Sequence, residues 1–283
     1  MPYTTLVDSA TLAAHLQDPQ WVMVDCRHDL ANPEAGAAAY GSGHLPGAVF
    51  LHLDRDLSGP KTGCNGRHPL PAPEKLVQCL EAVGIGDGTQ VVAYDDCGGM
   101  MAGRLWWLLR WLGHDRVALL DGGLQAWLGA GQPLATDNSR VYPVPTPGRL
   151  TAAMRNWVVE VEDVLAGLGS ADRLIVDARS PDRFRGENES IDPMAGHIPG
   201  ARNRFFRNNL DGDGRFKASE ELRRDFLALF QGVPPEQVVH QCGSGVSACH
   251  NLLAMEIAGL SGSRLYAGSW SEWCADPERP VEK

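Results

Sequence analysis

The chain has 283 residues, of which 43% are hydrophobic and 21% charged, and its formal net charge is −10. The length predicts two domains or one large one, with enough apolar material for a sizeable core. The acidic balance argues against nucleic acid or an anionic membrane as a partner. No segment reaches the roughly 18 uninterrupted apolar residues of a membrane helix, and the N-terminus lacks the pattern of a secretory signal.

The cysteines indicate the compartment. Seven of them lie scattered along the chain, at positions 26, 64, 79, 97, 242, 249 and 274, with no Cys-x-x-Cys pair. This spacing does not predict a structural zinc site, and no metal or organic cofactor is expected. We expect a cytoplasmic protein whose thiols are reduced, and at least one of them can still be reactive.

The first half of the chain predicts alternating helices and strands. A helix is expected over 9–17, with its first serine as the cap, and a buried strand follows at 22–24. A second helix, opened by a proline, is expected over 73–83, and residues 91–93 form another apolar, β-branched run. This order is typical of α/β proteins.

The second half continues the same alternation. Buried strands are predicted at 174–176 and 238–240, and a helix between them over 219–230, capped by its first serine. We therefore expect an α/β fold with a mostly parallel sheet flanked by helices. In open sheets of this kind, ligands bind at the carboxyl ends of the strands.

The chain repeats itself. VMVDCRH at 22–28 resembles LIVDARS at 174–180, and GHLPGAV at 43–49 resembles GHIPGAR at 196–202. Two further pairs, VVAYDD with VVHQCG and DGGLQAW with YAGSWSEW, follow in the same order, and all four offsets lie between 146 and 153 residues. Four ordered matches predict two copies of one fold.

The segment between the copies has the composition of a linker. Residues 137–150, DNSRVYPVPTPGRL, contain three prolines and no helical apolar period. We therefore expect two domains, at 1–136 and 151–283, joined by a linker at 137–150.

The second copy holds the strongest candidate for chemistry. A buried strand ends at about Gln241, and Cys242 follows at once. A turn of small residues then leads into a helix: Gly243, Ser244, Gly245, Val246 and Ser247. This geometry directs backbone N–H groups and a helix N-terminus at one point, which favours a thiolate and would hold a persulfide anion equally well. The plainer alternative is a buried structural cysteine beside an incidental glycine-rich turn.

The first copy lacks this cysteine. Cys242 aligns with Asp95, which cannot act as a sulfur nucleophile. We therefore expect the first copy to keep the fold without the chemistry. Cys97 aligns with Ser244 and is interpreted as structural, and Cys249 is interpreted as a thiol packed in the following helix.

These motifs together resemble the tandem-rhodanese sulfurtransferases, which include thiosulfate and 3-mercaptopyruvate sulfurtransferases. The resemblance covers nearly the whole chain. It rests on GHLPGA and GHIPGA, the paired VDxR-type strands, the Cys-Gly-Ser-Gly-Val loop and the terminal GSWSEW. It implies two rhodanese domains, an inactive first and an active second, with the site at their interface.

The resemblance also implies double displacement through Cys242. The thiolate takes a sulfur atom from a small-molecule donor and becomes a persulfide. Cyanide, a small thiol or a reduced thioredoxin-like protein then removes the sulfur. Cys242 matches the nucleophile of the family, and the backbone from Gly243 to Ser247 matches its cradle.

The loop after Cys242 favours one donor over the other. Thiosulfate-preferring members typically carry basic side chains there, whereas this neutral loop is similar to the mercaptopyruvate type. Ser244 matches the hydroxyl of that type, and alignment of the first copy places Asp54 and His68 beside it. A Ser-His-Asp relay could protonate the departing enolate or manage the thiol proton. The plainer alternatives are a solvated loop histidine and a turn carboxylate.

Arg183, in SPDRFRG, matches the family arginine that binds the carboxylate of the donor, although it could also be a surface helix charge. A guanidinium suits this role because it holds a planar carboxylate through two hydrogen bonds. Mercaptopyruvate enzymes often carry a second arginine nine residues later, where this chain has Asp192. The candidates to compensate are Arg185, Arg202, Arg204 and Arg207.

Two kinds of duplicated motif are expected to be structural. One kind is an ion pair at a strand end, formed by Asp25 with Arg27 and by Asp177 with Arg179. The other is a histidine that holds a turn, His44 in the first copy and His197 in the second. Because one copy is inactive, a residue present in both is better explained by the fold than by chemistry.

We expect a sulfurtransferase that moves sulfane sulfur from 3-mercaptopyruvate to a thiol or cyanide. A thiosulfate:cyanide sulfurtransferase is one alternative, and a persulfide carrier that delivers sulfur to a protein partner is another. A Cys-based phosphatase is disfavoured, because its Cys-x5-Arg motif needs an arginine where this chain has Ala248.

Overall fold

The computed structural model describes residues 1–136, 148–170 and 172–283. Most of the expected linker, 137–147, lies outside the described residues. Two compact units are present: unit 1 comprises 1–59, 71–155 and 213–215, and unit 2 comprises 60–70, 156–212 and 216–283. The segment 60–70 therefore belongs to unit 2, although it lies in the first copy of the sequence repeat.

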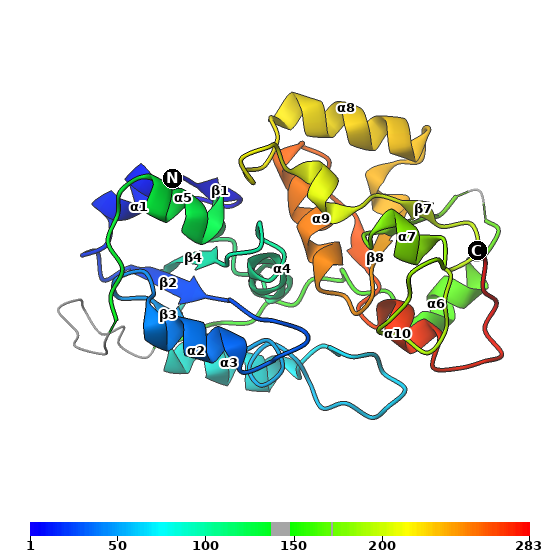
Figure 1. Cartoon of the computed structure of the whole chain (residues 1–283), viewed down its shortest axis with the longest axis horizontal. Coiled ribbons are helices and arrows are strands. Elements are labelled where there is room, and N and C mark those ends of the chain that lie inside the picture. The colour runs from blue at the N-terminus through cyan, green and yellow to red at the C-terminus, as the bar shows by residue number, and fades with distance from the viewer. Residues whose placement is uncertain (137–147, 171) are drawn as a thin grey trace. The chain divides into compact units, whose positions relative to one another are not determined.

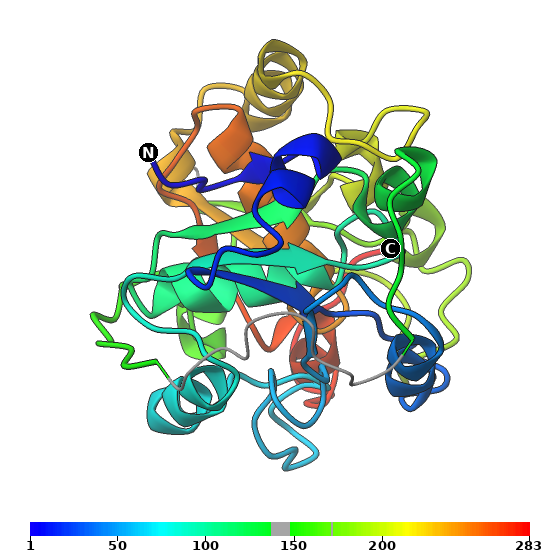
Figure 2. The ribbon, with the colours of Figure 1, turned by 90° about the vertical axis from the view of Figure 1, so that its left-hand side faces the viewer.

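Unit 1 is a parallel sheet with helices on both faces (Figure 1). Its strands, in spatial order, are β1 (Leu6–Val7), β5 (Val117–Leu120), β4 (Gln90–Tyr94), β2 (Trp21–Asp25) and β3 (Val49–Phe50). Its helices are α1 (Ser9–Ala14), α2 (Ala35–Ser42), α3 (Pro73–Ala82), α4 (Ala102–Trp111) and α5 (Gly123–Gly129). Figure 2 shows the strands side by side, with α1 on one side of the sheet and α3 on the other.

The sheet of unit 1 is buried on both faces. Met23, Val92 and Ala118 belong to a cluster that includes Leu12 of α1 and Trp127 of α5. The residues that alternate with these along the strands point to the opposite face and are equally buried. Helix α4 packs against β4 and β5. Burial of both faces explains why these strands appear in the sequence as continuous apolar runs.

Unit 2 repeats this plan. Its strands, in spatial order, are β7 (Arg202–Asn203), β6 (Leu174–Asp177), β8 (Val238–Gln241) and β9 (Arg264–Leu265), and all neighbours are parallel. Its helices are α6 (Val161–Ala166), α7 (Pro181–Phe184), α8 (Ser219–Phe230), α9 (Ser247–Ile257) and α10 (Ser269–Trp273), with 3₁₀ turns η1 (Phe206–Asn209) and η2 (Pro235–Gln237). A parallel bridge from Val158 to Leu265 takes the place of β1.

The core of unit 2 has the same two sides. Ile175 and Val239 of the central strands pack with Trp270 and Trp273 of α10 and with α6. Helix α9 contacts β8, and α8 packs on α9. The predicted fold class, an α/β protein built from two parallel sheets flanked by helices, is confirmed.

Two expected helix caps are wrong. Helix α1 begins at Ser9, but its N-cap is Asp8, whose carboxylate accepts a hydrogen bond from the third residue of the helix, and the helix ends at Ala14. Helix α8 begins at Ser219, whose hydroxyl donates to the carbonyl oxygen of Ile257 instead of capping its own helix. Both serines have a neighbour or a tertiary partner that competes for the role.

The duplicated motifs hold equivalent positions in the two units. Arg27 lies 2.6 Å from Asp25, and Arg179 lies 2.7 Å from Asp177; each arginine also donates to the glycine carbonyl that opens its turn. Nδ1 of His44 and Nδ1 of His197 each lie 2.8 Å from a carbonyl oxygen.

In the part of the chain that the structure describes, no helix is long and apolar enough to span a membrane.

Candidate active site

The carboxyl end of β8 places Cys242 at the start of a tight loop in unit 2. The cysteine is buried, and α9 begins five residues later. The N–H of Trp270 donates to the Cys242 carbonyl at 3.0 Å, and the N–H of Ser271 donates to the Gly243 carbonyl at 2.9 Å. The terminal GSWSEW motif therefore braces the loop that carries the thiol.

The rest of the predicted cradle lies in the same turn. Gly245 has φ +75°, and a Cβ atom there would lie 2.3 Å from the carbonyl oxygen of Ala267, so only glycine fits. Val246 is buried and directly precedes α9, which begins at Ser247. The turn therefore leads directly from the thiol to a helix N-terminus, where negative charge is stabilised.

Ser269 binds the backbone of Cys242 and was not predicted from the sequence. Its Oγ accepts the N–H of Cys242 at 3.1 Å and donates to the carbonyl of Tyr266 at 3.0 Å. Ser269 has φ +54°, whereas the equivalent residue of the first copy is Gly123, with φ +57°. A serine in this conformation is uncommon, so its hydroxyl is the reason to have it there. The alignment of GSW with GGL was the available signal.

In the first copy, the equivalent turn binds a carboxylate through its backbone N–H groups. The carboxylate of Asp95 accepts four backbone N–H groups at 2.8–3.0 Å, those of Cys97, Gly99, Met101 and Ala102. Four donors thus converge on a negative charge at the position that corresponds to Cys242. The repeat therefore supports the interpretation that the turn after Cys242 favours an anion.

The other cysteines have surroundings that disfavour a thiolate or engage the thiol. Burial raises the pKa of Cys97, and the neighbouring Asp95 raises it further. The thiol of Cys249 donates to the carbonyl of Gly245 at 3.2 Å. All seven cysteines are free, so none is held in a disulfide.

Ser244 and His68 lie together in unit 2. The Oγ of Ser244 is 2.7 Å from Nδ1 of His68, and both residues are buried. His68 reaches this position because its segment is tied to the GSWSEW motif: the N–H of Arg67 donates to Oγ of Ser271 at 3.0 Å. A buried hydroxyl–imidazole pair two residues from Cys242 can transfer a proton to or from a substrate.

Asp54, the third residue of the predicted relay, lies in unit 1. Its Oδ2 is 3.6 Å from Nε2 of His28, and its N–H donates to Nδ1 of His52 at 3.1 Å. The structure brings Ser244 and His68 together within one unit, and the part of Asp54 in a relay stays a prediction.

His28, His52 and Asp54 are also, within the described ranges, the one group of three possible metal ligands whose ligand atoms lie within 4.8 Å of one another. His52 is already engaged on both ring nitrogens, since Nδ1 accepts the N–H of Asp54 and Nε2 is 3.0 Å from the carbonyl of Pro33. A metal would need a lone pair from each imidazole. In this arrangement, neither ring nitrogen of His52 is available to bind a metal ion.

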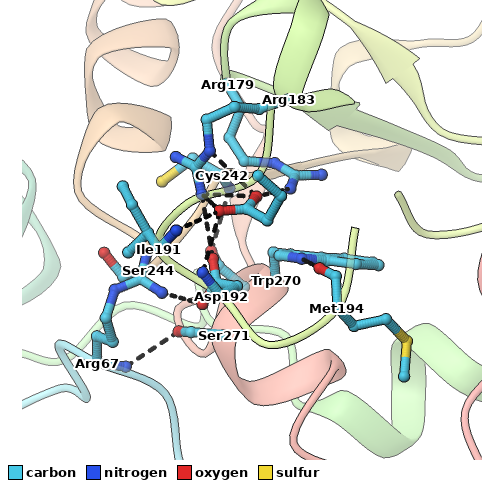
Figure 3. Close-up of polar contacts among 12 residues, drawn as sticks. Arg67, Arg179, Arg183, Ile191, Asp192, Met194, Cys242, Ser244, Trp270 and Ser271 are labelled. Carbon is cyan, nitrogen blue, oxygen red and sulfur yellow. Dashed lines mark hydrogen bonds and ion pairs between the residues drawn. The ribbon is translucent and has the colours of Figure 1, made fainter. Parts of the chain in front are cut away.

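Arg183 extends from α7 toward two buried carboxylates (Figure 3). Its Nη2 lies 2.8 Å from Oε1 of Glu189 and 3.1 Å from Oδ2 of Asp192. Burial raises the pKa of Glu189, but hydrogen bonds from the backbone and from Arg183 outweigh it and lower that pKa overall. The guanidinium predicted to bind the donor is thus held in place by acidic side chains.

Arg67 is a second guanidinium at this point, and sequence reasoning missed it. Its Nη1 pairs with Oδ1 of Asp192, so the two oxygens of Asp192 serve Arg67 and Arg183 separately. The only signal was its place directly before His68. The four arginines considered as compensation are engaged elsewhere: Arg185 with Glu187, Arg202 with the Leu229 carbonyl, Arg204 with Asp225, and Arg207 over the ring of Phe206.

Arg179 is a third guanidinium of this cluster, with its Nη1 3.5 Å from Oε2 of Glu189. Burial lowers the pKa of Arg179, but Asp177, Glu189 and Cys242 together outweigh burial and raise it. Three carboxylates offset the charges of three guanidiniums. The carboxylates are those of Asp177, Glu189 and Asp192, and the guanidiniums are those of Arg67, Arg179 and Arg183. The cluster therefore carries balanced charges, and any preference of the turn for an anion would have to come from its N–H groups.

Comparison with known proteins decides the family. The rhodanese-like domain family matches the chain twice, over residues 8–130 and 160–276. The chain belongs to the tandem-rhodanese sulfurtransferases.

Three relatives show how far the similarity extends. A Pseudomonas aeruginosa protein, named a probable 3-mercaptopyruvate sulfurtransferase, is 48% identical over 283 residues and 99% of each chain. The 3-mercaptopyruvate sulfurtransferase of Escherichia coli is 34% identical over 100% of this chain and 99% of its own. The solved structure of 3-mercaptopyruvate sulfurtransferase from Leishmania major has a TM-score of 0.83 at 33% identity, covering 95% of this chain and 74% of that one. The predicted enzyme class is confirmed.

Proposed function

We propose that this rhodanese is a 3-mercaptopyruvate sulfurtransferase that carries one sulfur atom at a time on Cys242. The observation that carries the proposal is the buried pair of Ser244 and His68, 2.7 Å apart in the loop of the nucleophile. A hydroxyl backed by an imidazole suits a donor whose leaving group is a carbanion that needs a proton. Two full-length relatives named for the same donor support it.

In the first half-reaction, the thiolate of Cys242 attacks the sulfur of 3-mercaptopyruvate. An S–S bond forms, the C–S bond breaks, and its electron pair moves to carbon as the enolate of pyruvate. Ser244, supported by His68, passes the proton of the donor's thiol group to the enolate, so pyruvate is released and a persulfide anion stays on Cys242. The turn N–H groups and the N-terminus of α9 stabilise the persulfide anion.

In the second half-reaction, an acceptor nucleophile attacks the outer sulfur of the persulfide. The S–S bond breaks, and its electron pair returns to Cys242 as the thiolate. The proposed acceptors are a small thiol, cyanide or a reduced thioredoxin-like protein. We also propose a cytoplasmic location, because seven free thiols suit a reducing compartment.

Thiosulfate is the second candidate donor. A Mycobacterium tuberculosis protein provisionally named a thiosulfate sulfurtransferase is 38% identical over 98% of this chain. Against this donor stands the loop from Gly243 to Val246, which carries no basic side chain of its own for a dianion. A persulfide carrier that serves a protein partner would form the same Cys242 persulfide but turn over small acceptors slowly.

The test compares kcat/KM for 3-mercaptopyruvate and thiosulfate, with cyanide or dithiothreitol as acceptor and Cys242→Ser as the control. We expect a strong preference for 3-mercaptopyruvate and no turnover in the control. A preference for thiosulfate would contradict the proposed donor and leave Cys242 as the nucleophile. Full activity of Cys242→Ser would contradict the mechanism with either donor.

A further inference from the structure

Unit 1 contains a cavity of about 460 Å³ that the proposed reaction does not use. It is lined by residues that follow the carboxyl ends of β2 and β4 and by the first turn of α2. Open parallel sheets bind ligands at this edge, and small-molecule sites commonly have volumes of about 300–1,000 Å³. The unit without the catalytic cysteine therefore keeps a cavity where a ligand site is expected.

A guanidinium with one unoccupied end lines this cavity. The side chain of Arg27 is only 7% exposed, and its Nε and Nη2 are held by Asp25 and by the carbonyl oxygen of Gly43. Within the described ranges, its Nη1 has no partner. In unit 2 the equivalent nitrogen, Nη1 of Arg179, lies 3.5 Å from the buried Glu189. Unit 1 thus leaves open a position that unit 2 fills with its own carboxylate.

The N-terminus of α2 borders the same cavity. Ala35, Gly36 and Ala39 line it, and a Cβ atom at Gly36 would lie 1.9 Å from the carbonyl oxygen of Arg27. Glycine therefore lets the helix begin directly against the end of β2. The N-cap residue, Glu34, makes no capping hydrogen bond with its side chain. A helix N-terminus carries partial positive charge, so it acts together with Arg27 to favour a carboxylate.

Two carboxylates also line the cavity, those of Asp29 and Asp96. Burial raises the pKa of Asp96, Asp95 raises it further, and Arg27 acts in the opposite direction. Asp96 and Arg27 therefore lie within electrostatic range of each other, and a cation beside Asp96 would offset its burial. A ligand that is only an anion would be repelled by two carboxylates, and one that is only a cation would leave Nη1 of Arg27 without an acceptor.

The remaining wall is apolar and rich in sulfur. It includes Leu30, Met100 and Met101. Cys97 also lines the cavity, and its thiol stays neutral because burial raises its pKa and Asp95 raises it further. Methionine side chains are flexible and polarizable, so they adapt to the shape of an apolar ligand. The cavity therefore suits a ligand that carries both charges at one end and an apolar group at the other.

We propose that this cavity binds a zwitterionic amino acid with an apolar or sulfur-containing side chain. Arg27 and the N-terminus of α2 hold its carboxylate, and Asp96 holds its ammonium group. Met100 and Met101 contact its side chain. Both charged groups of an amino acid are attached to one carbon atom, so they need a cation and a carboxylate that lie near each other. None of these residues takes part in the proposed reaction, so the proposal does not depend on the sulfur donor.

The first test compares three ligands by calorimetric titration. L-Methionine is the probe, because its thioether cannot accept sulfur from Cys242 as a thiol would. 4-(Methylsulfanyl)butanoate lacks only its ammonium group, and 3-(methylsulfanyl)propylamine lacks only its carboxylate. We expect one molecule of methionine to bind per chain, and each analogue to bind about 10- to 100-fold more weakly, as for loss of a charged hydrogen-bond partner. Failure of methionine to bind, or equal binding of either analogue, would overturn the proposal.

Substitutions locate the bound amino acid. Ala39→Phe fills the cavity, whereas Ala38→Phe adds the same ring at an exposed position of the same helix. We expect the first to abolish methionine binding and the second to leave it unchanged. Asp96→Asn should weaken binding about tenfold, whereas Asp18→Asn, which removes the same charge from unit 1 outside the cavity, should not. Circular dichroism verifies folding. Unchanged binding in Asp96→Asn, or equal losses in a variant and its control, would overturn the site.

Nuclear magnetic resonance of ¹³C-methyl methionine gives a readout at the cavity itself. Unlabelled L-methionine should shift the methyl signals of Met100 and Met101, which Met100→Leu and Met101→Leu assign. The signal of Met255, which is buried in α9 of unit 2, should not move. A shift of Met255 without a shift of either cavity methionine would place the ligand in unit 2 and overturn the proposal.

Discussion

Ser269 combines a strained backbone with a hydrogen bond to Cys242. A non-glycine residue in the left-handed region costs about 1–3 kcal/mol. At φ +54° Ser269 bears this strain while its hydroxyl accepts the N–H of Cys242. The first copy, which has Asp95 in place of the cysteine, uses Gly123 in the same conformation. The strain is therefore specific to the copy that contains Cys242.

Two substitutions separate the strain from the hydrogen bond. Ser269→Ala keeps the strain and loses the hydroxyl, whereas Ser269→Gly loses both. We expect Ser269→Gly to be the more stable by about 1 kcal/mol in urea unfolding, and both to form the persulfide about tenfold more slowly. Rapid-quench measurement of pyruvate release gives the rate. A normal rate in either variant would show that the hydroxyl does not position Cys242.

The sequence points to candidate site residues whose neighbours lie close by in the chain. Cys242 and Ser244 follow a recognisable strand and turn, and the resemblance brought in His68, which the structure places 2.7 Å from Ser244. Arg67 could not be found in this way, because its partner Asp192 lies 125 residues away in the sequence. A buried ion pair between distant segments leaves no local pattern.

At the scale of elements, the turn of the first copy that corresponds to the one after β8 binds a carboxylate, that of Asp95. We expect Cys242→Asp to fold and to transfer no sulfur, because its carboxylate can accept the turn N–H groups as Asp95 does. At pH 7 it should exceed Cys242→Ala in free energy of unfolding by about 1–3 kcal/mol. Urea unfolding of both variants checks this, and a Cys242→Asp protein less stable than Cys242→Ala would mean that the turn does not favour an anion.

The strands were predictable and several element ends were not. The four apolar runs became β2, β4, β6 and β8, because buried parallel strands require apolar residues on both faces. The N-cap of α1 is Asp8 and not the adjacent Ser9. Aspartate and serine have similar preferences for the N-cap, so the sequence does not choose between them. The packing of segment 60–70 on unit 2 was also hidden, since a loop with no apolar period does not indicate its partner.

At the scale of the whole molecule, stability should depend on pH through His240. This residue is fully buried in β8, and burial lowers its pKa to about 3, whereas an unfolded histidine titrates near 6.5. Below about pH 6.5 the unfolded chain binds a proton that the folded protein does not. The free energy of unfolding therefore falls as the pH is lowered, by up to about 1.4 kcal/mol per pH unit.

Comparison with His240→Leu isolates this effect from other titrating groups. Between pH 7.5 and 5.5, the unsubstituted protein should lose about 1 kcal/mol more of its free energy of unfolding than the variant does. Urea unfolding at the two pH values measures both losses. Equal losses would show that His240 is protonated in the folded state or does not contribute.

The duplicated architecture was predictable because both copies kept their turn and strand motifs, which the fold needs in each unit. Composition was less informative about the site. A net charge of −10 argues against polyanionic partners, yet it does not indicate the cluster of Arg67, Arg179 and Arg183 with their carboxylates. Such local balance depends on the tertiary structure.

The most direct test is to locate the transferred sulfur atom. The protein is mixed with one equivalent of 3-mercaptopyruvate without acceptor, and its peptides are examined by mass spectrometry. We predict one added sulfur on the peptide that contains Cys242, its loss on addition of cyanide, and no added sulfur in Cys242→Ser. Sulfur on another cysteine, or pyruvate release at the normal rate in Cys242→Ser, would contradict the account.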